Sequence, residues 1–295
     1  MEDLKGSISE WLPGKQSEPE GAVPVPGSRN LINRACVARF CTMAAPTKVA
    51  IITGASAGIG RHTAIALGEA GWKVVITARR SEALEETKDM MKILENKNCL
   101  AMAGDITQET FVKSLFEETI QIFGRLDLLF NNAGMFQPQI PIENLPLEVF
   151  QNVINVNLIA PFLCTQQAMR IFKSQSPSGG RIINNGSVSA QVPRPLSYAY
   201  SSSKHALTGL TKTTALEGRP FNITCTQINI GNTETGLANR LAQGALQADG
   251  RIIPEPLMDV RHVVNSIMHV VGLPNDVSVL EMTVLPTQMP FIGRG

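Results

Sequence analysis

A glycine-rich stretch, TGASAGIG at residues 53–60, separates an apolar run at residues 49–52 from a helical pattern of apolar residues that begins at Ile59. This arrangement predicts a buried strand, a tight turn and a helix N-terminus. Glycine tolerates a positive φ and lets the backbone approach a ligand closely, because it has no Cβ. The free N–H groups and dipole of a helix N-terminus attract phosphate. The residues expected against a pyrophosphate are Gly54, Ser56, Gly58, Ile59 and Gly60.

From Thr47 onward, strand-like apolar runs alternate with helical patterns. The strands are short and continuously apolar, as expected when helices cover both faces of a parallel sheet. The pattern predicts an α/β fold: a single doubly wound Rossmann domain with a mainly parallel, about seven-stranded sheet flanked by helices. Strands are expected at 49–53, 73–77, 99–103, 126–131, 181–185, 223–228 and 280–284, and helices near 59–70, 81–95, 108–123, 147–172 (broken in one interpretation), 200–217 and 259–271.

Three polar motifs follow later strands. The sequence NNAG at residues 131–134 closes one strand, Ser187 follows another, and YSSSK at residues 200–204 begins a helix thirteen residues beyond Ser187. Residues four apart on a helix share a face, so Tyr200 and Lys204 are expected side by side, whereas Tyr198 points elsewhere. A lysine ammonium favours the phenolate and lowers the tyrosine pKa from about 10. Such a tyrosine can exchange a proton with a carbonyl or alcohol oxygen.

With these motifs in this order and at this spacing, the chain resembles the short-chain dehydrogenase/reductase family, whose hallmarks are TGxxxGxG, NNAG, a serine before the tyrosine, and YxxxK. The resemblance spans about residue 46 to the C-terminus. It implies an oxidoreductase that transfers hydride between a nicotinamide cofactor and a carbonyl or secondary alcohol. By the same resemblance, Ser187 binds the substrate oxygen, Lys204 also holds the nicotinamide ribose, and Asn157 orders a water for proton relay. Asn155 is the competing candidate for the last role.

The resemblance also implies further cofactor contacts. Asp105 would accept from the adenine amino group, although a turn aspartate is the alternative. Backbone of Asn131, Ala133 and Gly134 would lie against the adenosine ribose, although Asn and Gly also suit a simple turn. After the sixth strand the family usually has Pro-Gly and then a threonine that contacts the carboxamide. Here the proline is replaced by Ile230, while the remaining candidates are Gly231, Thr233 and Thr235.

The end of the second strand bears on the choice between NAD and NADP. NAD-preferring relatives carry an acid for the ribose 2′-hydroxyl where this chain has Ala78. Arg79 instead offers a planar, permanently charged group suited to a 2′-phosphate, and Arg80 could assist it. Ala57 stands where some NADP users add a second basic residue. We therefore expect NADP(H), with NAD(H) possible.

The stretch at about residues 233–256 is where relatives keep a mobile substrate lid. Its Ala, Leu and Gln content favours a largely uncharged substrate, although a helix docking its apolar face gives the same pattern. Enzyme alternatives are an NAD-dependent alcohol or sugar dehydrogenase and a 3-oxoacyl-thioester reductase. A non-catalytic dinucleotide-binding regulator belongs to another class, and such proteins commonly lose the tyrosine or lysine that this chain keeps. The family commonly assembles as homodimers or homotetramers.

Composition excludes several other classes. A net charge of +1 gives no electrostatic basis for binding nucleic acid, and no stretch approaches the roughly 18 uninterrupted apolar residues of a membrane span. The five cysteines and four histidines show no metal-ligand spacing, so we expect no metal and reduced thiols in a cytoplasmic setting.

Residues 1–45 differ from the expected domain at 46–295, because they contain scattered prolines and no sustained apolar period. Such a segment cannot offset its ordering entropy, which predicts a disordered extension. Three arginines and no acid between Gly27 and Ala45 leave organellar targeting open, but Glu2, Asp3 and Glu10 make a poor transit peptide.

A chain that begins at Met43 tests this interpretation. We expect it to keep the melting temperature and turnover of the full chain, because the removed residues lack the apolar period needed to dock. Thermal unfolding and steady-state rates measure both quantities. A large loss of either would mean that the extension packs on the domain or completes its site.

Overall fold

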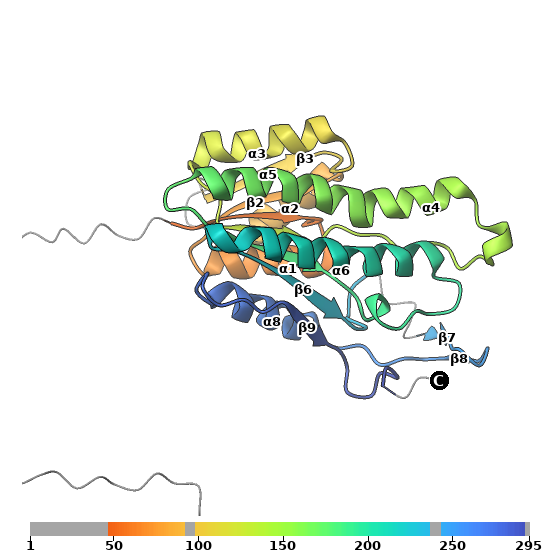
Figure 1. The fold of residues 1–295 in the computed structure, drawn as a ribbon. Coiled ribbons are helices and arrows are strands. Elements are labelled where there is room, and N and C mark those ends of the chain that lie inside the picture. Colours follow the sequence, from red (N-terminus) through yellow and green to blue (C-terminus); the bar gives the residue numbers. More distant parts are fainter. Residues whose placement is uncertain (1–46, 92–97, 237–242, 293–295) are drawn as a thin grey trace, which may run out of the picture. The chain divides into compact units, whose positions relative to one another are not determined.

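The computed structural model describes residues 47–91, 98–236 and 243–292, so the extension expected at 1–45 lies outside the described residues. The described chain forms one seven-stranded parallel sheet in the order β3-β2-β1-β4-β5-β6-β9 (Figure 1). Its strands are β1 (Val49–Thr53), β2 (Lys73–Ala78), β3 (Cys99–Ala103), β4 (Leu128–Asn131), β5 (Gly180–Asn185), β6 (Ile223–Ile230) and β9 (Glu281–Val284).

Helices cover both faces of this sheet, as Figure 1 shows. They are α1 (Gly58–Glu69), α2 (Ser81–Met90), α3 (Glu109–Phe123), α4 (Leu147–Ile154), α5 (Ala160–Ser174), α6 (Tyr198–Gly218) and α8 (Val260–Gly272). The chain moves outward from β1 to β3 and then returns to place β4 on the other side of β1. This reversal is the topological switch point at which doubly wound folds bind their ligands. The predicted fold class is confirmed.

The predicted elements agree closely with the observed ones, with three differences. The helix expected at 147–172 is interrupted by a π-helical turn, η3 (Asn155–Ile159), between α4 and α5. The helix expected at 81–95 corresponds to α2, which ends at Met90. Residues 92–95 lie outside the described residues. A small antiparallel hairpin of β7 (Ala245–Leu246) and β8 (Ile252–Ile253) was not predicted. Its strands have two residues each, too few to display a period.

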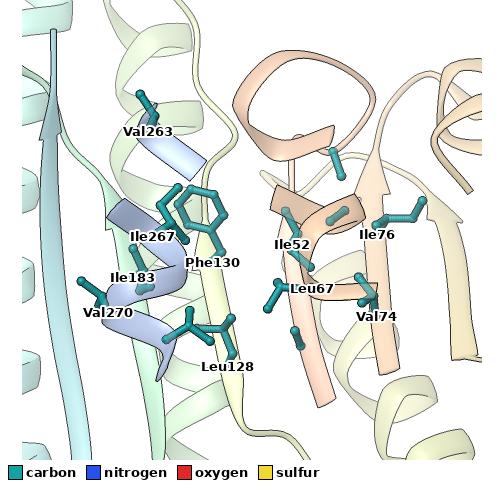
Figure 2. Packing of buried hydrophobic residues seen from close by; sticks show 14 of the residues in the cluster. Ile52, Leu67, Val74, Ile76, Leu128, Phe130, Ile183, Val263, Ile267 and Val270 are labelled. Atoms are coloured by element: carbon teal, nitrogen blue, oxygen red, sulfur yellow. The ribbon is translucent and has the colours of Figure 1, made fainter. Parts of the chain in front are cut away.

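One face of the sheet packs against α1, α2 and α8. Figure 2 shows Val263, Ile267 and Val270 of α8 beside Leu128 and Phe130 of β4, all of them fully buried. The three α8 residues follow the i, i+4, i+7 spacing that places side chains on one helix face. Burial of such a side chain contributes about 1.5–3 kcal/mol. This packing fixes β4, whose carboxyl end carries the NNAG sequence.

The other face packs against α3 and α5, whose buried side chains join the inner residues of β1, β4 and β5. Among the described residues, the continuous run Leu147–Ser174 is long and apolar enough to cross a membrane, by length and composition alone. Phe172 of this run is fully buried, but Leu147 and Phe162 are 68% and 46% exposed. The hydropathy of the run therefore combines a face packed on the sheet with an exposed apolar face.

Candidate active site

A cavity of about 920 Å³ lies at the carboxyl ends of the strands. It extends from the glycine-rich turn after β1 to the first turn of α6, so one cavity joins the predicted phosphate site to the predicted proton donor. Its walls contain most of the residues predicted from sequence: Gly54, Ser56, Gly58, Ile59, Arg79, Asp105, Ala133, Gly134, Ser187, Tyr200, Lys204, Gly231, Thr233 and Thr235.

The glycine-rich turn is packed tightly against the NNAG loop. Gly54 has φ +67°, and a Cβ there would lie 2.7 Å from Ala133 Cα, so a side chain at Gly54 would displace the loop. Gly60 does not line the cavity, and a Cβ there would lie 2.6 Å from the Gly54 carbonyl oxygen. Gly60 therefore supports the turn from behind and does not face the ligand space.

The N-terminus of α1 lines this cavity through Ala57, Gly58 and Ile59. Its N-cap, Ala57, makes no side-chain cap hydrogen bond, and the first turn contains no acidic residue among those described. Most helices satisfy their first backbone amides with a side chain, whereas an anion can take that place. The chemistry of this end of the cavity thus fits a pyrophosphate.

Polar side chains join the ends of β1, β4 and β5. Thr53 Oγ1 accepts from Asn132 N and Ala133 N, both at 3.0 Å. Asn132 Nδ2 donates to Thr53 O at 2.8 Å, and its Oδ1 accepts from Asn185 Nδ2 at 2.9 Å. Asn131 points the other way: its Nδ2 donates within the interior to Asn184 Oδ1 at 2.9 Å, so its side chain does not line the cavity. Asn132 is the NNAG side chain that faces the site.

Tyr200 lies on the wall of the cavity beside Ser187 and Phe136. Ser187 lines the same cavity, and the Phe136 ring centroid is 4.4 Å from that of Tyr200. Burial raises the pKa of Tyr200 to about 12, although the hydrogen bond to Ser187 and the charge of Arg194 act to lower it. The phenol is therefore protonated at neutral pH in this structure.

Lys204 shares the face of α6 with Tyr200, as predicted. Its ammonium lies 5.6 Å from the centroid of the Tyr200 ring and donates to the Asn185 carbonyl at 2.6 Å. Burial lowers the pKa of Lys204 to about 8. The expected lowering of the tyrosine pKa by Lys204 is not observed in this structure. Desolvation of the phenol outweighs the charges around it, and Arg194 supplies the lowering charge.

Asn157 lies in η3 and is 1% exposed. Its Oδ1 accepts from Met135 N at 2.9 Å, and its Nδ2 donates to Met135 O and Ser203 Oγ. Asn157 does not line the cavity, whereas the competing candidate Asn155 does. The Asn157 side chain therefore joins η3 to the loop after β4 and to the catalytic helix.

Gln137 is a residue that sequence reasoning missed. Its Oε1 accepts from the amides of Ala199 at 2.6 Å and Tyr200 at 3.0 Å, and its Nε2 donates to Leu196 O at 3.1 Å. These contacts satisfy the first amides of α6, whose N-cap residue, Ser197, makes no side-chain cap bond. Gln137 is 62 and 63 positions from its partners, so no local spacing could reveal this cap.

The end of β2 presents two arginines at the rim of the cavity. Arg79 is exposed, and Arg80 donates from Nη2 to Ser56 Oγ at 3.1 Å. Arg79 was the predicted ligand for a 2′-phosphate and Arg80 its assistant. This hydrogen bond holds Arg80 against the glycine-rich turn. Because Arg79 and Arg80 both line the cavity, both should be substituted when cofactor preference is tested. Ala78 also lines the cavity, with no acid in its place.

Three further predicted cofactor contacts have local partners. Asp105 Oδ1 accepts from Thr107 N at 2.9 Å and Thr107 Oγ1 at 2.8 Å, as a turn aspartate does, and Asp105 also lines the cavity. The Thr235 methyl lies 3.3 Å from the position of a Cβ at Gly58, which places Thr235 beside the glycine-rich turn. Thr233 Oγ1 donates to Gly231 O at 3.1 Å.

Within residues 47–91, 98–236 and 243–292, no three His, Cys, Asp or Glu side chains come together as a metal site would require. Cys99, Cys164 and Cys225 are free and buried. Cys36 and Cys41 lie outside the described residues.

Comparison with known proteins agrees with this geometry. The family model for short chain dehydrogenase matches residues 48–245. An uncharacterized oxidoreductase of Bacillus subtilis (strain 168), YxjF, is 38% identical over 190 residues, which cover 64% of this chain and 72% of that protein.

Two solved structures are similar across the whole domain. The 3-ketoacyl-(acyl-carrier-protein) reductase of Brucella melitensis, complexed with NADH, has a TM-score of 0.72 and 26% identity, covering 82% of this chain and 98% of its own. A variant of the actinorhodin polyketide ketoreductase with NADPH has a TM-score of 0.71 and 25% identity, covering 81% and 96%. One neighbour carries NADH and the other NADPH, so likeness alone does not choose between these cofactors.

Proposed function

The chain belongs to the short-chain dehydrogenase family of oxidoreductases, and within it we propose an enzyme that transfers hydride between NADP(H) and a carbonyl or secondary alcohol of a small, largely uncharged substrate. The observation that carries this proposal is the single cavity lined by both the glycine-rich turn and the set Ser187, Tyr200 and Lys204. Hydride transfer needs a dinucleotide site and a proton donor that reach the same substrate atom.

In the proposed reaction, the nicotinamide supplies or accepts the hydride when bound. The Tyr200 hydroxyl gives its proton to the carbonyl oxygen, and the hydrogen bond from Ser187 stabilises the phenolate that remains. A protonated phenol at neutral pH is the form that reduction of a carbonyl requires. Lys204 stabilises the same phenolate and holds the nicotinamide ribose. Asn157 fixes η3 against the catalytic helix through Ser203.

Other residues that line the cavity would contact the remaining parts of the cofactor. The N-terminus of α1 would hold the pyrophosphate with Thr235 beside it, and Ala133 and Gly134 would approach the adenosine ribose. The Asp105 carboxylate would accept a hydrogen bond from the adenine amino group. Thr233 is the candidate for contacting the nicotinamide carboxamide. The carbonyl could belong to a 3-oxoacyl thioester, an alternative favoured by the similar reductase of Brucella melitensis.

Consumption of NADPH across a panel of carbonyl compounds tests the proposed activity. The panel should contain simple ketones, sugars and 3-oxoacyl thioesters, with NADH measured in parallel. Turnover of at least one carbonyl compound is expected. Cofactor binding without turnover of any compound would favour a non-catalytic dinucleotide-binding protein.

Tyr200→Phe keeps the ring and its contact with Phe136 but removes the proton that must move. We expect folding and NADPH affinity to survive while kcat falls about 10²–10⁴-fold, the usual contribution of a general acid. Tyr198→Phe is the matched control, because Tyr198 begins the same helix but does not line the cavity. An inactive Tyr198→Phe beside an active Tyr200→Phe would show that the assignment of the catalytic tyrosine is wrong.

Cofactor preference is tested by Arg79→Ala and Arg80→Ala. We expect each to weaken NADPH binding about 10- to 100-fold while NADH binding changes little, because a charge-assisted hydrogen bond contributes about 1.5–3 kcal/mol. Ala78→Asp should move the preference toward NAD. Fluorescence titration with both cofactors measures these affinities. If NADPH binds both arginine variants as tightly as the wild type, the arginines have no part in its recognition.

We also propose a homo-oligomer, because the run of α4, η3 and α5 exposes Leu147, Ile159 and Phe162. A second copy of the chain would cover this apolar face. Light scattering at micromolar concentration should give a multiple of the 31.9 kDa chain mass. A monomer mass would contradict the proposal, and Phe162→Glu should shift the oligomer toward that mass.

A further inference from the structure

A buried ion pair joins the loop before α6 to the segment that contains the β7–β8 hairpin. Arg194 Nη1 donates to Glu255 Oε1 at 2.7 Å, and Arg194 Nη2 donates to Glu255 Oε2. The Glu255 side chain is 1% exposed and that of Arg194 is 14% exposed. The planar guanidinium thus meets the carboxylate with two parallel hydrogen bonds, the strongest and most directional form of this contact.

Two amide side chains complete this network. Asn232 Nδ2 donates to Glu255 Oε2 at 2.7 Å, and Gln247 Nε2 donates to Glu255 Oε1 at 2.8 Å. Asn232 Oδ1 in turn accepts from Arg194 Nη2 at 3.2 Å. Burial acts to raise the pKa of Glu255, but the hydrogen bonds from Arg194, Gln247 and Asn232 together lower it to about 2. The carboxylate therefore stays charged at neutral pH.

The hairpin segment is defined here as residues 245–258, and among the described residues main-chain hydrogen bonds join its Met258 end to the loop after β6. Met258 N donates to Asn232 O at 3.0 Å, and Glu234 N donates to Met258 O at 2.9 Å. The hairpin lies at the opposite, N-terminal end of the segment, and each of its strands has two residues. Such a short hairpin is marginally stable without other contacts. The Glu255 network supplies contacts at Gln247, beside β7, and at Glu255, just after β8.

The other end of the ion pair belongs to the site. Arg194 and Asn232 both line the cavity, and Arg194 lies six residues before Tyr200. Ser197 Oγ donates to Arg194 O at 2.6 Å, and Leu196, between them, has a φ of +59°. A left-handed leucine is uncommon and persists only where its surroundings hold it. The loop that leads to the catalytic tyrosine is therefore held in one conformation by specific contacts.

We propose that Arg194 and Glu255 are positioning residues that fasten the hairpin segment to the loop before the catalytic helix and so shape the substrate end of the cavity. This inference rests on the proposed function. A buried ion pair adds little stability compared with apolar side chains of similar volume, so stability alone gives little reason for its presence.

Glu255→Gln tests the fastening without any substrate. The amide keeps the size of the side chain but loses the charge that Arg194 requires. In hydrogen exchange measured by mass spectrometry on the full chain, we expect peptides covering residues 245–253 to exchange at least tenfold faster, while those from β4, β5 and α6 are unchanged. Gln247→Ala removes one bond of the network and should give a smaller change in the same peptides.

Arg251→Gln is the matched control. Arg251 and Asp249 form an ion pair on the same hairpin, but their side chains are 72% and 49% exposed. Solvent-exposed pairs contribute little, so exchange in the hairpin segment should remain at the wild-type rate. Unchanged exchange in both Glu255→Gln and Gln247→Ala would overturn the proposal, and Gln247→Ala decides it if Glu255→Gln fails to fold.

Kinetics separates positioning from a general structural role. With a carbonyl compound turned over in the panel described above, KM for that compound should rise at least fivefold in Glu255→Gln. The Kd for NADPH should stay within twofold, because neither Arg194 nor Glu255 is among the proposed cofactor contacts. Parallel losses of NADPH affinity, kcat and melting temperature would contradict a positioning role. If no carbonyl compound is turned over by the wild type, the proposed function fails, and the exchange experiment alone still decides whether the pair fastens the segment.

Discussion

Polar atoms at the carboxyl ends of parallel strands must find partners, and in this protein those partners hold the site together. Thr53, Asn132 and Asn185 link the ends of β1, β4 and β5, and the Asn185 carbonyl accepts from Lys204. An unbroken series of hydrogen bonds thus runs from the glycine-rich turn to the catalytic helix. A buried polar group without a partner costs about 1–3 kcal/mol, so each member of the series keeps its neighbour in place.

Burial has opposite consequences for the two ionisable groups on α6. It raises the pKa of Tyr200 to about 12 and lowers that of Lys204 to about 8, so both neutral forms are favoured. A tyrosine that keeps its proton can donate it. The phenolate that remains would be buried, so nearby positive charge or hydrogen-bond donors must stabilise it. Ser187 and Arg194 act in that direction, and Lys204 still carries its charge at neutral pH. In the proposed mechanism, these groups would partly compensate the desolvation of the phenolate.

The parts of this structure that follow from sequence are those encoded by short spacing. The strand, turn and helix around Gly54, the ends of the other strands, and the shared face of Tyr200 and Lys204 are all found this way. Gln137 and the Arg194–Glu255 pair were not found, because their partners are some 60 positions away. Local patterns carry no information about such contacts, which arise only once the sheet brings distant loops together. The expected effect of Lys204 on Tyr200 failed for a related reason, since desolvation depends on the whole surrounding structure.

The family model likewise covers only part of the described domain. The family model ends at residue 245, where the hairpin segment begins, so it covers the dinucleotide turn and the tyrosine but little of this segment. Gln137 and Arg194 line the cavity, and Glu255 lies behind Arg194, with which it forms a buried ion pair. The substrates of relatives therefore say little about this chain's own substrate. Its character has to be inferred from this wall, in which Arg194 lines the cavity while the buried Glu255 holds it in an ion pair.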